Sequence, residues 1–200
     1  MKPILSWWQI GLLLAVCAAG IFLLLPDDPQ LIEQLLRDGQ TKEARRQFDQ
    51  VSAAQRAQQA DRYRLLGVQI GRRELAPRDT AAFAAWWRLA VSAWRDSGYA
   101  DGIFAELQPM IARLPDPAAA WAVIAPEVPR APAGQRTRLV DDFVRAALGA
   151  GQAATAAEAF ALAHPAAGRS GADALELARL WQLAGRADAA LAALGEHVTP

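Results

Sequence analysis

This chain of 200 residues is poor in the residue types that catalytic and metal sites use. It has one cysteine, Cys17, and two histidines, His164 and His197, and none of them belongs to a spaced ligand motif. A single cysteine excludes an internal disulfide, and Cys17 cannot act with a histidine as a nucleophile if it lies in a membrane. We therefore expect no enzymatic activity, no metal site and no cofactor.

Strand signals are also absent, because no run of alternating β-branched or aromatic residues reaches a useful length. The 21 basic and 21 acidic residues balance and are scattered, so a nucleic-acid-binding surface is not indicated. Asp141 and Asp142 are adjacent on a predicted helix and point about 100° apart, which is typical of a solvated first turn and not of a shared metal or proton site. The sequence predicts an all-α fold.

One long apolar segment runs from Ile4 to Leu25 and stops at Pro26-Asp27-Asp28. About 22 residues at 1.5 Å each extend about 33 Å, enough to cross a hydrocarbon core of roughly 30 Å. We expect residues 1–3 to be a short cytoplasmic N-terminus and 4–25 to be a transmembrane helix, because Lys2 favours the inner side. With the N-terminus in the cytoplasm, the residues after the anchor would lie on the other side of the membrane. The arginine-rich, lysine-poor composition is typical of a GC-rich bacterial genome, and in a bacterium that side is the periplasm.

Two other interpretations of this segment stay open. A cleaved secretory signal would end near Ala18-Ala19-Gly20, and a lipoprotein signal would use Cys17. Either cleavage would leave the apolar residues 21–25 on the mature protein, and Val16 stands where the lipoprotein box prefers a small residue. An uncleaved anchor in the lipid bilayer of the bacterial inner membrane fits the segment best.

After the anchor, apolar residues recur at helical spacing in segments separated by glycine, proline or aspartate. They predict one helical domain over residues 29–197. Three prolines between residues 126 and 134 mark a candidate hinge. The predicted helices span 29–38, 41–57, 60–72, 79–97, 100–113, 117–126, 134–149, 153–164, 171–184 and 187–197.

A glycine pattern recurs between predicted helices: alanine follows five residues after the glycine and a bulky apolar residue nine after it. The copies are Gly39-Ala44-Phe48, Gly151-Ala156-Phe160 and Gly185-Ala190-Leu194, with Gly98-Ile103-Leu107 as a variant that has a larger middle residue. Gly151 and Gly185 are 34 residues apart, which is the tetratricopeptide period. The domain thus resembles degenerate tetratricopeptide repeats (TPR-like), and the resemblance implies a right-handed α-solenoid of helical hairpins. An ordinary helical bundle is the alternative.

Tryptophans are concentrated in one predicted helix. Trp87 and Trp94 are seven residues apart and share a face, whereas Trp86 and Leu89 point elsewhere. The resemblance implies that Trp86 and Leu89 pack in the core, while Trp87 and Trp94 line the concave face and bind a partner. The alternative is that all three tryptophans belong to the core. The same carry-over places on the concave face Arg64, Val68, Asp141, Arg145, Arg179 and Gln182, whose arginines would clamp a carboxylate or an acidic peptide.

These features predict a membrane-anchored protein–protein interaction scaffold of a bacterial cell-envelope complex, of the secretion, polysaccharide-export or assembly type. Its partners would be proteins of the membrane or periplasm and not nucleic acids, and a homo-oligomer is compatible with the pattern. The alternative is a structural subunit that associates through its transmembrane helix, where Gly11 and Ala15 allow close contact. The helical domain would then be a spacer or self-association module.

Overall fold

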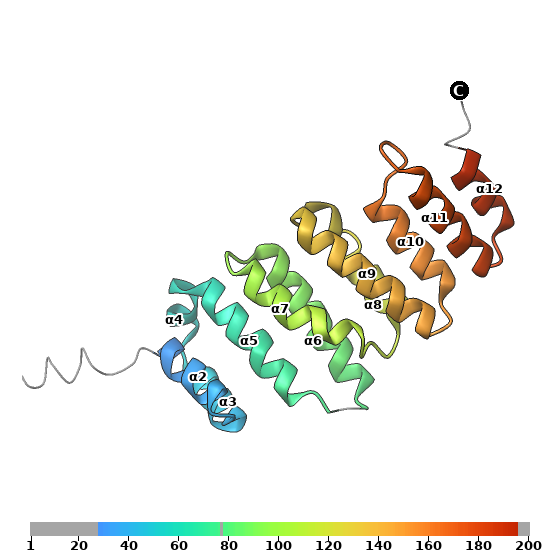
Figure 1. The fold of residues 1–200 in the computed structure, drawn as a ribbon. Helices are drawn as coiled ribbons and strands as arrows, with labels where there is room; N and C mark the ends of the chain where they lie inside the picture. The colour runs from blue at the N-terminus through green and yellow to red at the C-terminus, as the bar shows by residue number, and fades with distance from the viewer. Residues whose placement is uncertain (1–27, 77, 196–200) are drawn as a thin grey trace, which may run out of the picture. The chain divides into compact units, whose positions relative to one another are not determined.

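The computed structural model describes residues 28–76 and 78–195, so the predicted anchor at 4–25 lies outside the described residues. Within them the chain forms eleven α-helices, one 3-10 helix and no strand, which confirms the all-α prediction (Figure 1). Across the same residues, none of the helices has the length and apolar character needed to cross a bilayer. The elements are α2 (Asp28–Arg37), α3 (Thr41–Gln50), α4 (Ala53–Gln58), α5 (Ala60–Glu74), α6 (Thr80–Asp96), α7 (Ala100–Ile111), α8 (Pro117–Ile124), η1 (Val128–Arg130), α9 (Ala133–Gly149), α10 (Ala153–Ala163), α11 (Gly171–Leu183) and α12 (Ala187–Gly195).

The helix boundaries agree with the predicted ones to within a few residues, except that the segment 41–57 is two helices. The chain turns at Ser52, whose hydroxyl accepts the N–H of Gln55, while the Gln55 side chain accepts the N–H of Ser52. This capping box starts α4 as a new helix. The candidate hinge at 126–134 contains η1, and it buries Val128 and Ala131.

Two compact units make up the described chain, and the boundary between them falls inside α5, after Leu66. The first unit is built on the hairpin of α2 and α3, with Ile32 and Ala44 fully buried. Arg62 Nε, at the start of α5, donates to Glu33 Oε1 of α2 at 2.8 Å. Apolar packing thus joins α2 to α3, and an ion pair joins α2 to the start of α5.

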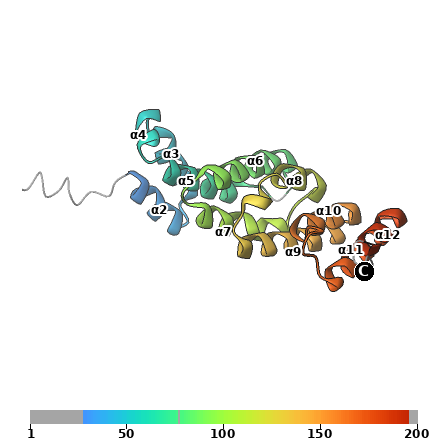
Figure 2. The same ribbon diagram turned by 90° about the horizontal axis from the view of Figure 1, so that it is seen from above.

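The second unit, from residue 67 onward, is a double layer of helices (Figure 2). In one layer α6 packs against α8 and α8 against α10, while in the other α7 packs against α9. α11 packs against α10 and α12 at the C-terminal end of the unit. The fully buried side chains of the core come from both layers and include Trp87, Leu107, Ile124, Phe143 and Leu180.

Three hydrogen bonds between neighbouring helices of the same layer join residues that are 34 apart in the sequence. They link α7 to α9 and α8 to the start of α10. The bonds run from Gln108 Nε2 to Asp142 Oδ2 (3.1 Å), from the N–H of Ala118 to Gln152 Oε1 (2.8 Å) and from Gln135 Nε2 to Asp101 Oδ1.

Three of the predicted glycine turns share one backbone geometry. Gly39, Gly151 and Gly185 have φ values of 75°, 72° and 72°. Each glycine N–H donates to the carbonyl three residues back, and the following N–H donates to the carbonyl five residues back. This is the Schellman motif, in which a left-handed glycine ends a helix. Gly98 has no positive φ, so the fourth copy of the pattern does not form this turn.

The alanine five residues after each of these glycines packs inside a hairpin. Ala44 and Ala156 are fully buried. Ala190 is partly buried in a cluster that contains Leu177 and Ala193. The small side chain therefore lies where the two helices of a hairpin approach each other, as the pattern predicts.

We expect Gly151→Ala and Gly185→Ala each to lower the free energy of unfolding by about 1–2 kcal/mol, because a Cβ disfavours the left-handed conformation. No atom lies within 4 Å of the added Cβ at either position, so the cost comes from the backbone alone. Urea unfolding followed by circular dichroism measures it. Gly171→Ala is the control, since its Cβ also meets nothing and its φ is not positive. Equal stability of all three variants would contradict the turn geometry.

Candidate protein-binding groove

A groove of about 720 Å³ lies between α7 and α9 in the second unit, within the range of about 300–1,000 Å³ typical of ligand clefts. The α7 side is largely apolar, with Pro109, Ile111 and Leu114. The α9 side has small residues, Ala146 and Gly149, which leave the helix surface open. This α7/α9 groove is lined by Gln108, Pro109, Ile111, Ala112, Leu114, Asp142, Arg145, Ala146, Gly149 and Ala150.

The polar centre of the groove is a bonded trio. Asp142 accepts hydrogen bonds from Gln108 Nε2 at 3.1 Å and from Arg145 Nη1 at 3.1 Å. Asp142 therefore holds Arg145 in place, yet 78% of the arginine side chain stays exposed. A guanidinium has five N–H donors, so Arg145 can bind a further carboxylate or carbonyl while it keeps this contact.

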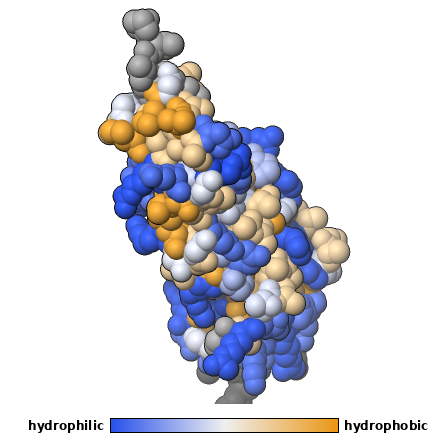
Figure 3. Space-filling model, turned by 90° about the vertical axis from the view of Figure 1, so that its right-hand side faces the viewer, coloured by the Kyte–Doolittle hydropathy of each residue, from blue (hydrophilic) through white to orange (hydrophobic). Residues whose placement is uncertain are grey.

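α11 repeats the arrangement of acid and arginine found on α9. In both helices an acidic residue lies nine residues before the turn glycine and an arginine lies six before it. On α11 these are Glu176 and Arg179, which are 3.5 Å apart, and 70% of the Arg179 side chain is exposed. Leu175 and Leu183 are exposed on the same helix, and Figure 3 shows apolar surface bordered by hydrophilic surface at this end of the unit.

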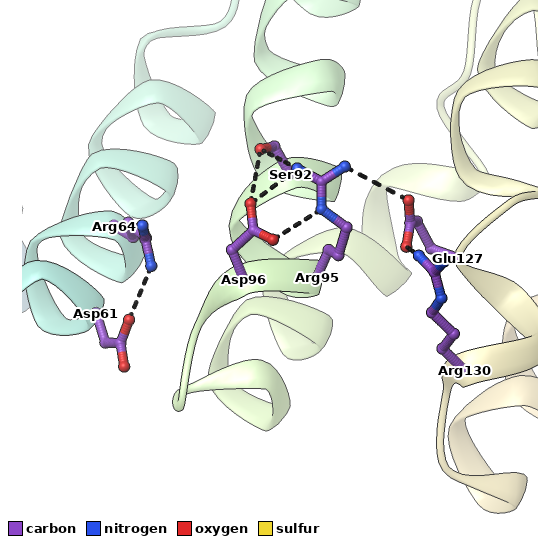
Figure 4. Close-up of polar contacts among 7 residues, drawn as sticks. All are labelled: Asp61, Arg64, Ser92, Arg95, Asp96, Glu127 and Arg130. Atoms are coloured by element: carbon purple, nitrogen blue, oxygen red, sulfur yellow. Dashed lines mark hydrogen bonds and ion pairs between the residues drawn. The ribbon is translucent and has the colours of Figure 1, made fainter.

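Five of the predicted partner-binding residues are exposed, but they do not form one cluster. They are Arg64 on α5, Asp141 and Arg145 on α9, and Arg179 and Gln182 on α11. Arg145 alone among them lines the α7/α9 groove. Arg64 belongs to the first unit, where it pairs with Asp61 at 2.9 Å (Figure 4). A role of these residues in partner binding stays a prediction.

The burial of the tryptophans shows that the predicted orientation of α6 is wrong. Trp87 and Trp94 were expected on a concave face, but their side chains are 1% and 5% exposed. Leu89, expected in the core, is 53% exposed, and Val68, expected on the concave face, is fully buried. All three tryptophans are therefore core residues, which is the alternative that the sequence left open.

The reason is that α6 is packed on several sides. Trp86 Nε1 donates to the carbonyl of Val68 in α5 at 2.9 Å, and Trp87 Nε1 donates to the carbonyl of Ala120 in α8 at 3.0 Å. Trp94 contacts Phe104 of α7, with ring centroids 6.0 Å apart. Each indole therefore points at a different neighbouring helix.

The exposed edge of α6 carries a polar network with η1 (Figure 4). Arg95 Nε contacts Asp96 Oδ1 at 2.8 Å, and Arg95 Nη1 lies 3.6 Å from Glu127 Oε1. Arg130 Nη1 contacts the other Glu127 oxygen at 2.9 Å. The adjacent Asp96 carboxylate raises the pKa of Arg95. These contacts join the C-terminal end of α6 to η1 and to Glu127, which precedes it.

His164 makes structural contacts at the end of α10. Its ring stacks on Phe160 with centroids 4.3 Å apart, and its Nδ1 lies 3.6 Å from Asp173 Oδ2. The Ser170 hydroxyl, which donates to that carboxylate, lowers the pKa of Asp173. Over residues 28–76 and 78–195, no group of three histidine, cysteine, aspartate or glutamate side chains lies in an arrangement that could hold a metal ion.

Sequence reasoning did not single out Gln108 and took Asp142 only as part of a solvated patch. Their hydrogen bond joins residues 34 apart, which is the spacing between Gly151 and Gly185. A search for polar pairs 34 residues apart would have found it. The same spacing relates Asp101 to Gln135.

Comparisons with protein-family models, with curated proteins and with solved structures gave no match to this chain.

Proposed function

We propose that this protein is a membrane-anchored scaffold whose TPR-like helical hairpins bind a protein partner through the α7/α9 groove and the exposed face of α11. The groove is the observation that carries the proposal. It combines an apolar wall with Arg145, a cation that Asp142 fixes but leaves exposed. Polypeptide segments with apolar and acidic side chains suit such a surface.

Two features support the tetratricopeptide type and the right-handed solenoid that it implies. Three hydrogen bonds between neighbouring helices of one layer join residues 34 apart, and this separation equals the tetratricopeptide period. The turns at Gly151 and Gly185 have the same Schellman geometry and are also 34 residues apart. Repeat proteins of this class use the exposed faces of successive helices as extended binding surfaces.

The partner would present a carboxylate next to an apolar side chain. Arg145 and Arg179 hold equivalent positions before their turn glycines, and each is paired with an acid three residues earlier. Intrahelical pairs of this kind are weak, about 0.3–0.5 kcal/mol, so they do not prevent the arginine from also binding a partner carboxylate. Leu148 and Leu175 are exposed on the same helices as these arginines and supply apolar contact area.

To test the groove, a photo-crosslinking amino acid is placed at Arg145 in the full chain in its own membranes, with Leu89 as the control position. We expect a crosslinked protein from position 145 that position 89 does not give. The purified partner should then bind Arg145→Glu at least tenfold more weakly than wild type, because charge reversal repels its carboxylate. Arg78→Glu, an exposed arginine outside the groove, should bind normally. Unchanged binding to Arg145→Glu would refute the groove as the partner site.

The membrane anchor and the envelope location rest on the apolar segment 4–25 and on Lys2 before it. We expect a cysteine placed at the exposed Asp101, in a Cys17→Ser background, to react with an impermeant maleimide in intact spheroplasts. Labelling only after lysis would place the helical domain in the cytoplasm. A mature N-terminus beyond residue 20 would remove the anchor.

A further inference from the structure

A second cavity, of about 400 Å³, lies between the first half of α6 and α8. Its floor and walls are apolar and include Phe83, Trp87, Ala120 and Val123. The volume falls in the range of small-ligand pockets, which are mostly apolar with a few polar groups at defined places. We call this cavity the α6/α8 pocket.

The floor of the α6/α8 pocket is held rigidly. Trp87 Nε1 donates to the Ala120 carbonyl at 3.0 Å, so the one polar atom of the indole is already bonded. The Phe83 and Trp87 rings lie nearly parallel, with an interplanar angle of 16° and centroids 6.4 Å apart. A preformed apolar floor without free donors selects an apolar group of the ligand.

The rim of the pocket carries two charges that differ in their bonding. Asp116 Oδ1 accepts hydrogen bonds from the N–H groups of Ala118 and Ala119 at 3.1 and 3.2 Å and from Gln152 Nε2 at 3.1 Å. The Gln152 bond, with the backbone bonds, lowers the pKa of Asp116, so this carboxylate is ionised and engaged at the start of α8.

Arg88 is the opposite case. It is exposed and lines the pocket, and among the described residues it has neither an ion pair nor a hydrogen bond from its side chain. The other arginine of this helix, Arg95, is bonded to Asp96. Arg88 is therefore the cation at the pocket that is open to an incoming anion.

We infer that the α6/α8 pocket binds an apolar side chain joined to a carboxylate, with the apolar group against the accessible wall residues Ala119 and Val123 and the carboxylate on Arg88. Such a group occurs at the carboxyl terminus of a polypeptide that ends in an apolar residue, and also in a free aromatic acid. The α6/α8 pocket shares Leu114 with the α7/α9 groove, but Arg88, Ala119 and Val123 do not line that groove, so the inference can fail or hold separately from it.

The probes are N-acetyl-L-phenylalanine, its amide and a six-residue peptide that ends in phenylalanine with a free carboxylate. They are titrated calorimetrically into the full chain in lipid nanodiscs, and empty nanodiscs are subtracted. We expect saturable binding of the acid with a Kd on the order of 0.1–1 mM and at least fivefold weaker binding of the amide. A peptide that binds at least tenfold more tightly than the acid identifies a polypeptide terminus as the ligand, and equal affinities identify a free acid.

Arg88→Gln should bind the acid and the amide alike, at the level of the amide in wild type. Ala119→Phe, which places a ring at an exposed position of the pocket wall, should abolish binding of both. Arg138→Gln, an exposed cation of α9 outside the pocket, and Arg145→Glu in the groove should both bind like wild type. Failure of wild type to bind the acid below 10 mM, or wild-type binding by both Arg88→Gln and Ala119→Phe, would overturn the inference.

Discussion

Trp87→Ala should lower the free energy of unfolding by about 3–5 kcal/mol, because the indole is 1% exposed and its removal leaves a large cavity. The ring packs against Phe143 of α9 with centroids 5.9 Å apart, so the substitution also loosens the contact between the two layers. Without the indole N–H, the Ala120 carbonyl loses a buried hydrogen bond. Urea unfolding of the purified protein measures the loss.

Leu89→Ala is the matched control, since it removes an apolar side chain from the same helix at an exposed position. We expect its stability to stay within about 0.5 kcal/mol of wild type. The opposite outcome, a stable Trp87→Ala with an unstable Leu89→Ala, would mean that α6 is turned as the sequence pattern first predicts.

Gly71→Ala should lower the free energy of unfolding by about 1–3 kcal/mol, although alanine favours a helix interior by about 1 kcal/mol over glycine. A Cβ at Gly71 would lie 2.8 Å from Trp86 Cδ1, well inside van der Waals contact. The ring cannot move away freely, because Trp86 is buried and its Nε1 is bonded to the Val68 carbonyl at 2.9 Å. Thermal and urea unfolding should both report the change.

Gly134→Ala is the control for the helix preference alone. Gly134 lies in the first turn of α9, and a Cβ there meets no atom within 4 Å. We expect Gly134→Ala to be neutral or more stable by up to about 1 kcal/mol. If the two variants change stability in the same direction and by the same amount, α5 and α6 do not approach closely at Gly71.

Much of the fold could be predicted from the sequence because its signals are local. Glycine at positions 39, 151 and 185 sets the left-handed turns, and apolar spacing sets the helices between them. The break at Ser52 was missed although its signal, a serine followed three residues later by glutamine, is also local.

The orientation of α6 could not be predicted in the same way. A seven-residue spacing shows that Trp87 and Trp94 share a face, but not whether that face meets solvent or another helix. α6 has apolar side chains on most of its circumference, so the identity of its exposed stripe depends on where α5, α7 and α8 pack. The positions of these helices are set by contacts between residues that are distant in the sequence. The helical periodicity of one segment carries no information about such contacts.

The resemblance to tetratricopeptide repeats placed Arg145 and Arg179 on an accessible face, and both are exposed. Their role in binding stays a prediction. The groove itself depends on the gap between α7 and α9, which Ala112, Ala146 and Gly149 leave unfilled. In an alanine-rich sequence, small residues also occur where two helices are in tight contact, as the buried Ala156 shows. The sequence therefore does not distinguish small residues that leave a groove open from small residues that let two helices pack closely.

The 34-residue separation of the bonds within each layer has a consequence for how the second unit folds. Closing a chain segment of this length costs little more entropy than closing one half as long, since each doubling adds only about 0.6 kcal/mol. Each helix pair can therefore fold onto its neighbour without waiting for a distant part of the chain. Within the second unit α11 packs between α10 and α12, whereas α12 packs against α11, so amide protons of α12 should exchange first and those of α6 and α8 last.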